Sequence, residues 1–136
     1  DLLKFWTHRA LEKQKSLYQN KIDRLKAQGY SAEEAQEEAG KAVAAPGTSE
    51  HQLGLAVDIV DVSNQNLDNS QEQTAVQKWL MKHSWEYGFI LRYPSDKSEI
   101  TGIIYEPWHY RYVGKEAAAE IQAQGVCLEE YLEKAD

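Results

Sequence analysis

The chain has 136 residues, a length that suits a single domain built around one hydrophobic core. Its residues are 42% hydrophobic and 27% charged, a composition typical of a soluble globular protein and too apolar for an intrinsically disordered one. With 15 Lys and Arg against 22 Asp and Glu, the net charge is −7, which argues against nucleic-acid binding because phosphates require basic partners. The single cysteine, Cys127, excludes an internal disulfide and a Cys-rich zinc knuckle. No apolar run is long enough to span a membrane.

Two helices are predicted in the first third of the chain. Apolar residues that recur from Leu11 at spacings of 7, 4 and 3 predict an amphipathic helix over about Ala10–Gln28. Ser31 and Glu34 have the spacing of a capping box, so a second helix begins there. This helix must end before Pro46.

The middle of the chain predicts one strand and one helix. Leu53–Val62 is rich in Leu, Val and Ile and predicts a strand that follows a loop. Ser70, with Gln73 as its capping partner, predicts the start of a third helix that Gly88 closes. The expected apolar face of this helix comprises Val76, Trp79, Leu80 and His83, so His83 is predicted to be a core or boundary histidine.

The last third alternates short strands with helices. Strands are expected at Phe89–Tyr93, Ile103–Tyr105 and Trp108–Val113, and helices at Lys115–Gln124 and Leu128–Lys134. These strands follow one another too closely for parallel crossovers, which need a dozen or more residues. We therefore expect a single α+β domain over residues 1–136, with a small, largely antiparallel sheet and flanking helices.

The segment around His51 and Asp58 could hold a metal ion. A straight strand would place the two residues about 23 Å apart, and a helix about 10 Å apart. Neither distance lets both contact one metal, so the chain must fold back, and Gly54 permits this. Asp58 lies within an apolar run, where a buried carboxylate needs a cation, a hydrogen-bond network or a metal. The alternative is an edge-strand aspartate that faces solvent.

A second candidate segment contains Glu106 and His109. In a straight strand these two residues would point to opposite faces, but Pro107 between them kinks the chain. The kink could bring the imidazole to a metal and the carboxylate beside it. The alternative is an aromatic-rich strand that contains a Glu and a His by chance.

Two histidines and one carboxylate match the catalytic type of zinc site, which leaves one position for water. The water needs a base to accept its proton, and Glu106 is an available carboxylate. The spacing alone is not diagnostic of such a site.

At these residues the sequence resembles the zinc D-alanyl-D-alanine carboxypeptidases of the VanY type, a group that includes the LdcB-type L,D-carboxypeptidases and belongs to the LAS metallopeptidases. The resemblance rests on Ser49-x-His51-x-x-Gly54-x-Ala56-x-Asp58 and Glu106-x-x-His109, and it extends from about Arg9 to the C-terminus. It implies a LAS/hedgehog-like zinc peptidase fold with one zinc ion per chain.

The resemblance also implies the roles of individual residues. His51, Asp58 and His109 would be the zinc ligands and Glu106 the catalytic base. Ser49 and Trp108 would line the substrate site.

Arg9 and Gln14 match the Arg and Gln of a family stretch at the start of the first helix, so both would contact substrate, and Arg9 would also take part in catalysis. The residues before Arg9 differ from the family pattern. The family's first strand is poorly represented in Asp1–Trp6.

We therefore expect a zinc D,D-carboxypeptidase that removes the terminal D-alanine from peptidoglycan stem peptides in the bacterial cell envelope, outside the membrane. It is expected to be a monomer, and its anchor or signal would lie outside this chain. An L,D-carboxypeptidase acting on tetrapeptide stems shares every motif and is the alternative. A different class of protein is a non-catalytic, zinc-containing domain that binds a cell-wall peptide or a partner.

Overall fold

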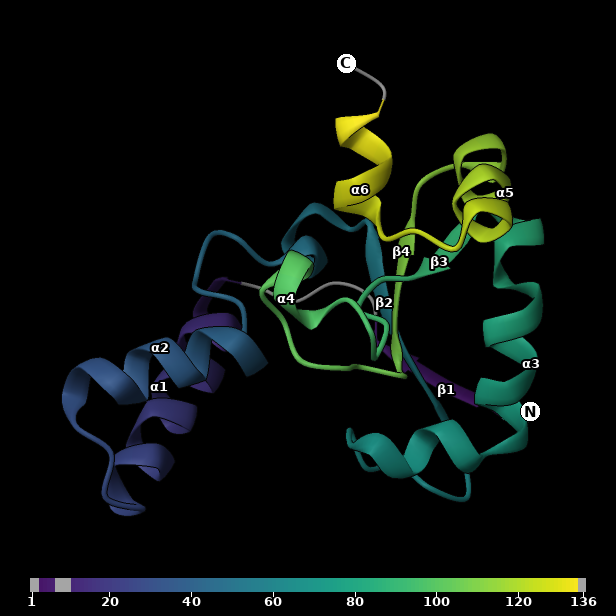
Figure 1. Cartoon of the computed structure of the whole chain (residues 1–136). Helices are drawn as coiled ribbons and strands as arrows, with labels where there is room; N and C mark the ends of the chain where they lie inside the picture. Colours follow the sequence, from purple (N-terminus) through teal and green to yellow (C-terminus); the bar gives the residue numbers. More distant parts are fainter. Residues whose placement is uncertain (1–2, 7–10, 135–136) are drawn as a thin grey trace.

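The computed structural model describes residues 3–6 and 11–134 of the chain, and it has an α+β architecture (Figure 1). Within these residues, four strands form one antiparallel sheet in the order β1-β2-β4-β3. The strands are β1 (Leu3–Trp6), β2 (Ala56–Asp61), β3 (Phe89–Leu91) and β4 (His109–Tyr112). The helices are α1 (Leu11–Ala27), α2 (Ala32–Ala42), α3 (Ala75–His83), α4 (Ser98–Thr101), α5 (Lys115–Gln124) and α6 (Leu128–Glu133). Short 3₁₀ turns are η1 (Glu50–Leu53), η2 (Asn69–Gln73) and η3 (Ser84–Tyr87). The predicted fold class is confirmed.

Helices α1 and α2 form a hairpin at one side of the sheet (Figure 1). The hairpin has a small apolar core of its own, made of Ile22, Leu25, Ala35 and Ala39 with Tyr18 packed against it. The predicted capping box is present, because the Ser31 hydroxyl accepts from the Glu34 amide and the Glu34 carboxylate accepts from the Ser31 amide. The two helices therefore begin and end close to where the sequence predicts.

The two faces of the sheet have different partners. Val57 and Tyr110 lie opposite each other on β2 and β4 and pack with Leu80 of α3. Side chains alternate along a strand, so the neighbouring pair, Asp58 and His109, points to the face away from α3. Toward β3 that second face is covered by α5 and α6, and α1 and α2 lie to its side (Figure 1). The unusual polar pair therefore lies between helices rather than in the apolar core.

The predicted third helix is divided into η2, α3 and η3, and the prediction that Ser70 caps it is wrong. Asp68 caps η2 by accepting from the Ser70 amide, and Thr74 caps α3 by accepting from the Gln77 amide. Each cap offers a short side-chain oxygen to an amide two or three residues on, which ends one helical segment and begins the next. The closing glycine, Gly88, is confirmed.

The buried face of α3 also differs from its prediction. Leu80 is buried, but Trp79 is 49% exposed and its ring stacks on His83, which pairs with Glu86 at 2.7 Å. His83 is thus a boundary histidine, as predicted. The fully buried side chain on this helix is the amide of Gln77, which an apolar pattern cannot identify.

Gln77 links α3 to two strands, and its loss should destabilise the fold. Its amide nitrogen donates to the Ile59 carbonyl, and its amide oxygen accepts from the Tyr110 hydroxyl at 2.9 Å. Gln77→Leu would leave the hydroxyl of the buried Tyr110 without its acceptor and remove the hydrogen bond to the Ile59 carbonyl, so we expect a loss of about 2–4 kcal/mol in the free energy of unfolding. Urea unfolding measures this loss. Lys78→Ala, an exposed neighbour on the same helix, should change stability by less than about 0.5 kcal/mol. A Gln77→Leu variant as stable as Lys78→Ala would contradict the prediction.

Three other expectations about strands differ from the structure. Ile103–Tyr105 is not a strand, because Ile104 donates its amide to the Lys41 carbonyl and so joins the end of α2 instead of the sheet. The first strand is present as β1, which pairs with β2 in antiparallel register. The predicted strand over Leu53–Val62 is shortened to β2 because η1 takes up its first residue. Among the described residues, no helix has the length and hydrophobicity needed to cross a membrane.

Candidate metal centre

His51 is brought to the sheet by the tight turn that precedes β2. It lies in η1, and this turn ends at Gly54, whose φ of 69° is in the left-handed region. A side chain at this position would meet no neighbouring atom, so the backbone angle and not space explains the glycine. The chain folds back as predicted. The imidazole of His51 is 3% exposed and lies next to Asp58.

Asp58 and His109 meet because their strands place them in register. The two residues are direct cross-strand partners on β2 and β4. Asp58 Oδ1 lies 3.1 Å from His51 Nε2 and 3.4 Å from His109 Nδ1. Asp58 is 2% exposed, so the alternative of a solvent-facing edge aspartate is wrong.

These three side chains fit a single metal ion. One donor atom from each of His51, Asp58 and His109 can be chosen so that all three lie within 4.8 Å of one another. Ligands about 2.0–2.1 Å from a tetrahedral zinc ion lie about 3.3 Å apart, close to the two distances from Asp58 Oδ1. The His51 and His109 rings meet edge to face, with centroids 4.9 Å apart. The donor set, two imidazoles and one carboxylate, is one that zinc prefers.

Glu106 lies beside this group and forms no part of it. Its Oε2 is 3.5 Å from His109 Nδ1. The chain turns at Pro107 and Trp108, and the His109 amide donates to the Glu106 carbonyl at 3.1 Å. The predicted kink is therefore a tight turn, which places both side chains of the Glu-x-x-His pattern on one site. Glu106 is 8% exposed.

The surrounding charges favour a cation at this position. Burial would raise the pKa of Asp58 and lower that of His109, but hydrogen bonds between the two have the opposite effect and prevail. The pKa of Asp58 is held below its usual range, and that of His109 is raised to about 9 by Asp58 together with Glu50 and Glu106. The carboxylates thus favour positive charge at the centre of the group.

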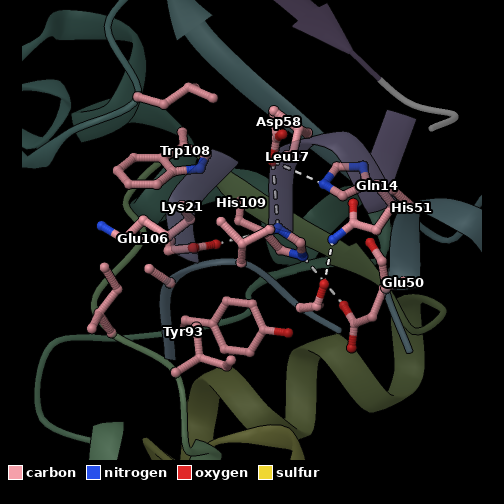
Figure 2. Close-up of a pocket in the computed structure, with 17 residues that line it drawn as sticks. Gln14, Leu17, Lys21, Glu50, His51, Asp58, Tyr93, Glu106, Trp108 and His109 are labelled. Atoms are coloured by element: carbon pink, nitrogen blue, oxygen red, sulfur yellow. Dashed lines mark hydrogen bonds and ion pairs between the residues drawn. The ribbon is translucent and has the colours of Figure 1, made fainter. Parts of the chain in front are cut away.

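The group lies in a cleft of about 310 Å³, within the size range of small-ligand sites. Figure 2 shows the histidines, Asp58 and Glu106 converging, with the Tyr93 ring facing His109. Of the predicted substrate residues, Ser49, Gln14 and Trp108 line this cleft and all three are buried. The apolar side of the cleft comes from α1, the end of α2, the segment after it and two loops, with Leu17, Ala42, Val43, Ala44, Leu67, Ile103 and Ile104.

The structure describes a contact for Gln14 but does not describe Arg9. The Gln14 amide donates to the Ala44 carbonyl, so this side chain ties α1 to the segment after α2. Arg9 lies outside the described residues, and its predicted role remains a prediction.

The sequence did not point to several residues at the site. Tyr93 and Lys21 line the cleft, and Glu50 lies 3.3 Å from His109 Nε2 through its Oε2. Glu50 immediately precedes His51, and this adjacency was the signal that could have identified it. Its partners lie far away in the chain and are not visible in local spacing.

The model of one protein family matches most of the chain. This is the family of VanY, D-alanyl-D-alanine carboxypeptidase, and the match covers residues 1–115. The chain belongs to the VanY family. It is 53% identical over 126 residues to the D-alanyl-D-alanine carboxypeptidase of Enterococcus faecalis (strain ATCC 700802 / V583). That match covers 92% of this chain and 45% of the relative, so the chain spans just under half of that protein.

Solved structures of VanY and of a related enzyme share the fold. VanYB in complex with D-alanine-D-alanine superposes with a TM-score of 0.88 at 48% identity, covering 99% of this chain and 72% of that one. A mutant VanY D,D-pentapeptidase from a VanB-type resistance cassette, in complex with Zn(II), has a TM-score of 0.80 at 52% identity and covers 93% and 68%. The LdcB LD-carboxypeptidase has a TM-score of 0.82 at 42% identity and covers 98% and 59%. The fold therefore occurs in members named for D,D and for L,D cleavage.

Proposed function

We propose that this chain is the catalytic domain of a zinc D,D-carboxypeptidase that removes the C-terminal D-alanine from peptidoglycan stem peptides. The observation that supports it most directly is the convergence of His51, Asp58 and His109 in one cleft, with Glu106 beside them. The three would hold zinc, and residues 1–136 would form one domain acting outside the membrane.

Zinc supplies two things when bound: it polarises the scissile carbonyl and lowers the pKa of the attacking water. Glu106 would accept a proton from that water and deliver it to the nitrogen of the leaving D-alanine, since its carboxylate lies at the metal group without belonging to it. Ser49 and Trp108 would bind the peptide along the buried wall of the cleft. Gln14, tied to Ala44, would keep α1 in place as the opposite wall.

The relatives support this choice of reaction. The family and the Enterococcus faecalis relative are named for D-alanyl-D-alanine, and VanYB binds D-alanine-D-alanine in a structure that covers 99% of this chain. The LdcB similarity keeps L,D cleavage of tetrapeptide stems as the second candidate. A binding domain without activity would not need Glu106 beside the ligand group.

One experiment separates the three functions. The zinc-loaded protein is incubated with a stem pentapeptide and, separately, with a stem tetrapeptide, and the products are weighed by mass spectrometry. We expect the loss of one alanine from the pentapeptide alone. Loss from the tetrapeptide alone would establish the L,D activity, and no loss from either would favour a binding domain.

Arg9 gives a further prediction. A carboxypeptidase must hold its substrate's terminal carboxylate or the developing oxyanion, and a guanidinium with paired donors suits both tasks. Arg9→Ala should lower kcat/KM more than Arg9→Lys, which keeps the charge but loses the fork, and both should keep their zinc. Steady-state kinetics on a D-alanine-terminated peptide checks this. Arg24→Ala, an exposed arginine of α1, is the matched control. If Arg9→Ala is as efficient as this control, Arg9 has no such role.

A further inference from the structure

The two ring nitrogens of His109 face different groups. Nδ1 faces Asp58 at 3.4 Å and Glu106 at 3.5 Å, on the side where the metal group converges. Nε2 faces Glu50, whose Oε2 lies 3.3 Å away (Figure 2). His51 is arranged in the opposite sense, because its Nε2 faces Asp58. The two candidate ligands therefore offer different nitrogens to one centre.

Two arginines hold Glu50 in place through its other carboxylate oxygen, Oε1. Its Oε1 accepts from Arg92 Nε at 2.7 Å and lies 2.9 Å from a guanidinium nitrogen of Arg111, two residues after His109 on β4. The Glu50 side chain is 11% exposed and that of Arg92 10%. Arg92 is anchored in turn by Glu129 of α6, through two hydrogen bonds of 2.9 and 2.6 Å. A chain of charged contacts thus runs from α6 to the back of His109.

An imidazole that binds a metal through one nitrogen carries its proton on the other. A carboxylate that accepts a hydrogen bond from this N–H fixes the tautomer and the ring orientation and makes the ligand more basic. We propose that Glu50 is the positioning residue of His109: its Oε2 accepts a hydrogen bond from the protonated Nε2 and so presents Nδ1 to the metal. The inference rests on the proposed metal-binding role of His109.

Two other roles for Glu50, as a metal ligand and as the general base, fit the geometry less well. Its Oε2 lies against His109 Nε2, across the ring from the nitrogen that faces Asp58, so it is not among the converging donors. Its Oε1 is occupied by two guanidinium groups, and a carboxylate so paired is a poor proton acceptor. The geometry therefore leaves Oε2 as a hydrogen-bond acceptor for the His109 ring.

The first test measures zinc affinity by competition with a chelator. Glu50→Gln removes the negative charge that faces His109 Nε2. Glu129→Gln is the matched control, because Glu129 pairs with the same Arg92 but forms no hydrogen bond with the His109 ring. We expect Glu50→Gln to bind zinc about 10–100-fold more weakly than wild type, the range typical of outer-shell partners. Glu129→Gln should stay within about 3-fold. Both variants lose an ion pair, so melting temperatures of the zinc-free proteins separate stability from affinity.

Affinity in Glu50→Gln equal to that of Glu129→Gln would make Glu50 a structural ion-pair residue only and would overturn the inference. Wild-type protein with no zinc affinity would overturn the proposed metal centre itself, so the two failures are distinguishable.

A second test needs no variant and therefore holds even if Glu50→Gln does not fold. Long-range ¹H–¹⁵N spectra of the zinc-loaded wild-type protein report which imidazole nitrogen carries the proton. We expect His109 to be protonated at Nε2 and His51 at Nδ1, with slow exchange of the His109 ring proton. A His109 ring protonated at Nδ1, or an Nε2 proton exchanging as fast as that of an exposed histidine, would overturn the inference.

Discussion

Glu106→Gln should keep its zinc and its fold, but its kcat should fall by about 10²–10⁴-fold or more, the loss typical of removing a general base. The amide has nearly the shape of the carboxylate, so the turn at Pro107 and the contact with His109 can persist. It cannot accept a proton at neutral pH, so the attacking water loses its proton acceptor. Turnover of a stem pentapeptide and the zinc content of the purified variant are the two measurements.

Glu99→Gln is the matched control for this change, because Glu99 is exposed on α4 and the substitution is chemically identical. It should turn over substrate at the wild-type rate. Loss of zinc from Glu106→Gln would make Glu106 a ligand, and near-normal turnover would deny it either role.

His51→Ala and His109→Ala should each lose zinc, because two remaining ligands hold the ion poorly. The loss of affinity should exceed the about 10–100-fold expected for an outer-shell partner, since a direct ligand is removed. Metal analysis of the purified variants and chelator competition measure it. Activity should disappear in step with the metal.

His83→Ala gives the comparison for this loss. His83 stacks on Trp79 at the surface of α3 and pairs with Glu86, so its removal should leave zinc binding unchanged. Near-stoichiometric zinc in His51→Ala or His109→Ala, at the affinity of His83→Ala, would remove that residue from the ligand set.

Local sequence signals predicted most of the elements that surround the site. The Ser31 and Glu34 capping box, the fold-back at Gly54 and the turn at Pro107 each depend on residues close together in the chain, and each is present. Such features are visible because their physical cause is local: a backbone angle, a missing amide proton or a short side-chain acceptor.

The errors concern features that only the tertiary structure decides. Ile103–Tyr105 has the composition of a strand, yet its backbone pairs with the end of α2. The buried amide of Gln77 interrupts the apolar pattern of α3 because it serves two strands. Glu50 and Arg92 are 42 residues apart and Arg92 and Glu129 are 37 apart, so the charged contacts behind His109 have no local signature.

The origin of the cleft's two sides has a consequence for how the family can diversify. The converging donors lie on β2, β4 and the turn before β2, whereas the apolar wall comes from α1, the segment after α2 and the loops with Leu67 and Ile103. A substitution on that wall can change which peptide end fits without moving a donor atom of the sheet. Selection for a different stem peptide can therefore act on the wall alone, and one reactive centre can persist through repeated changes of substrate.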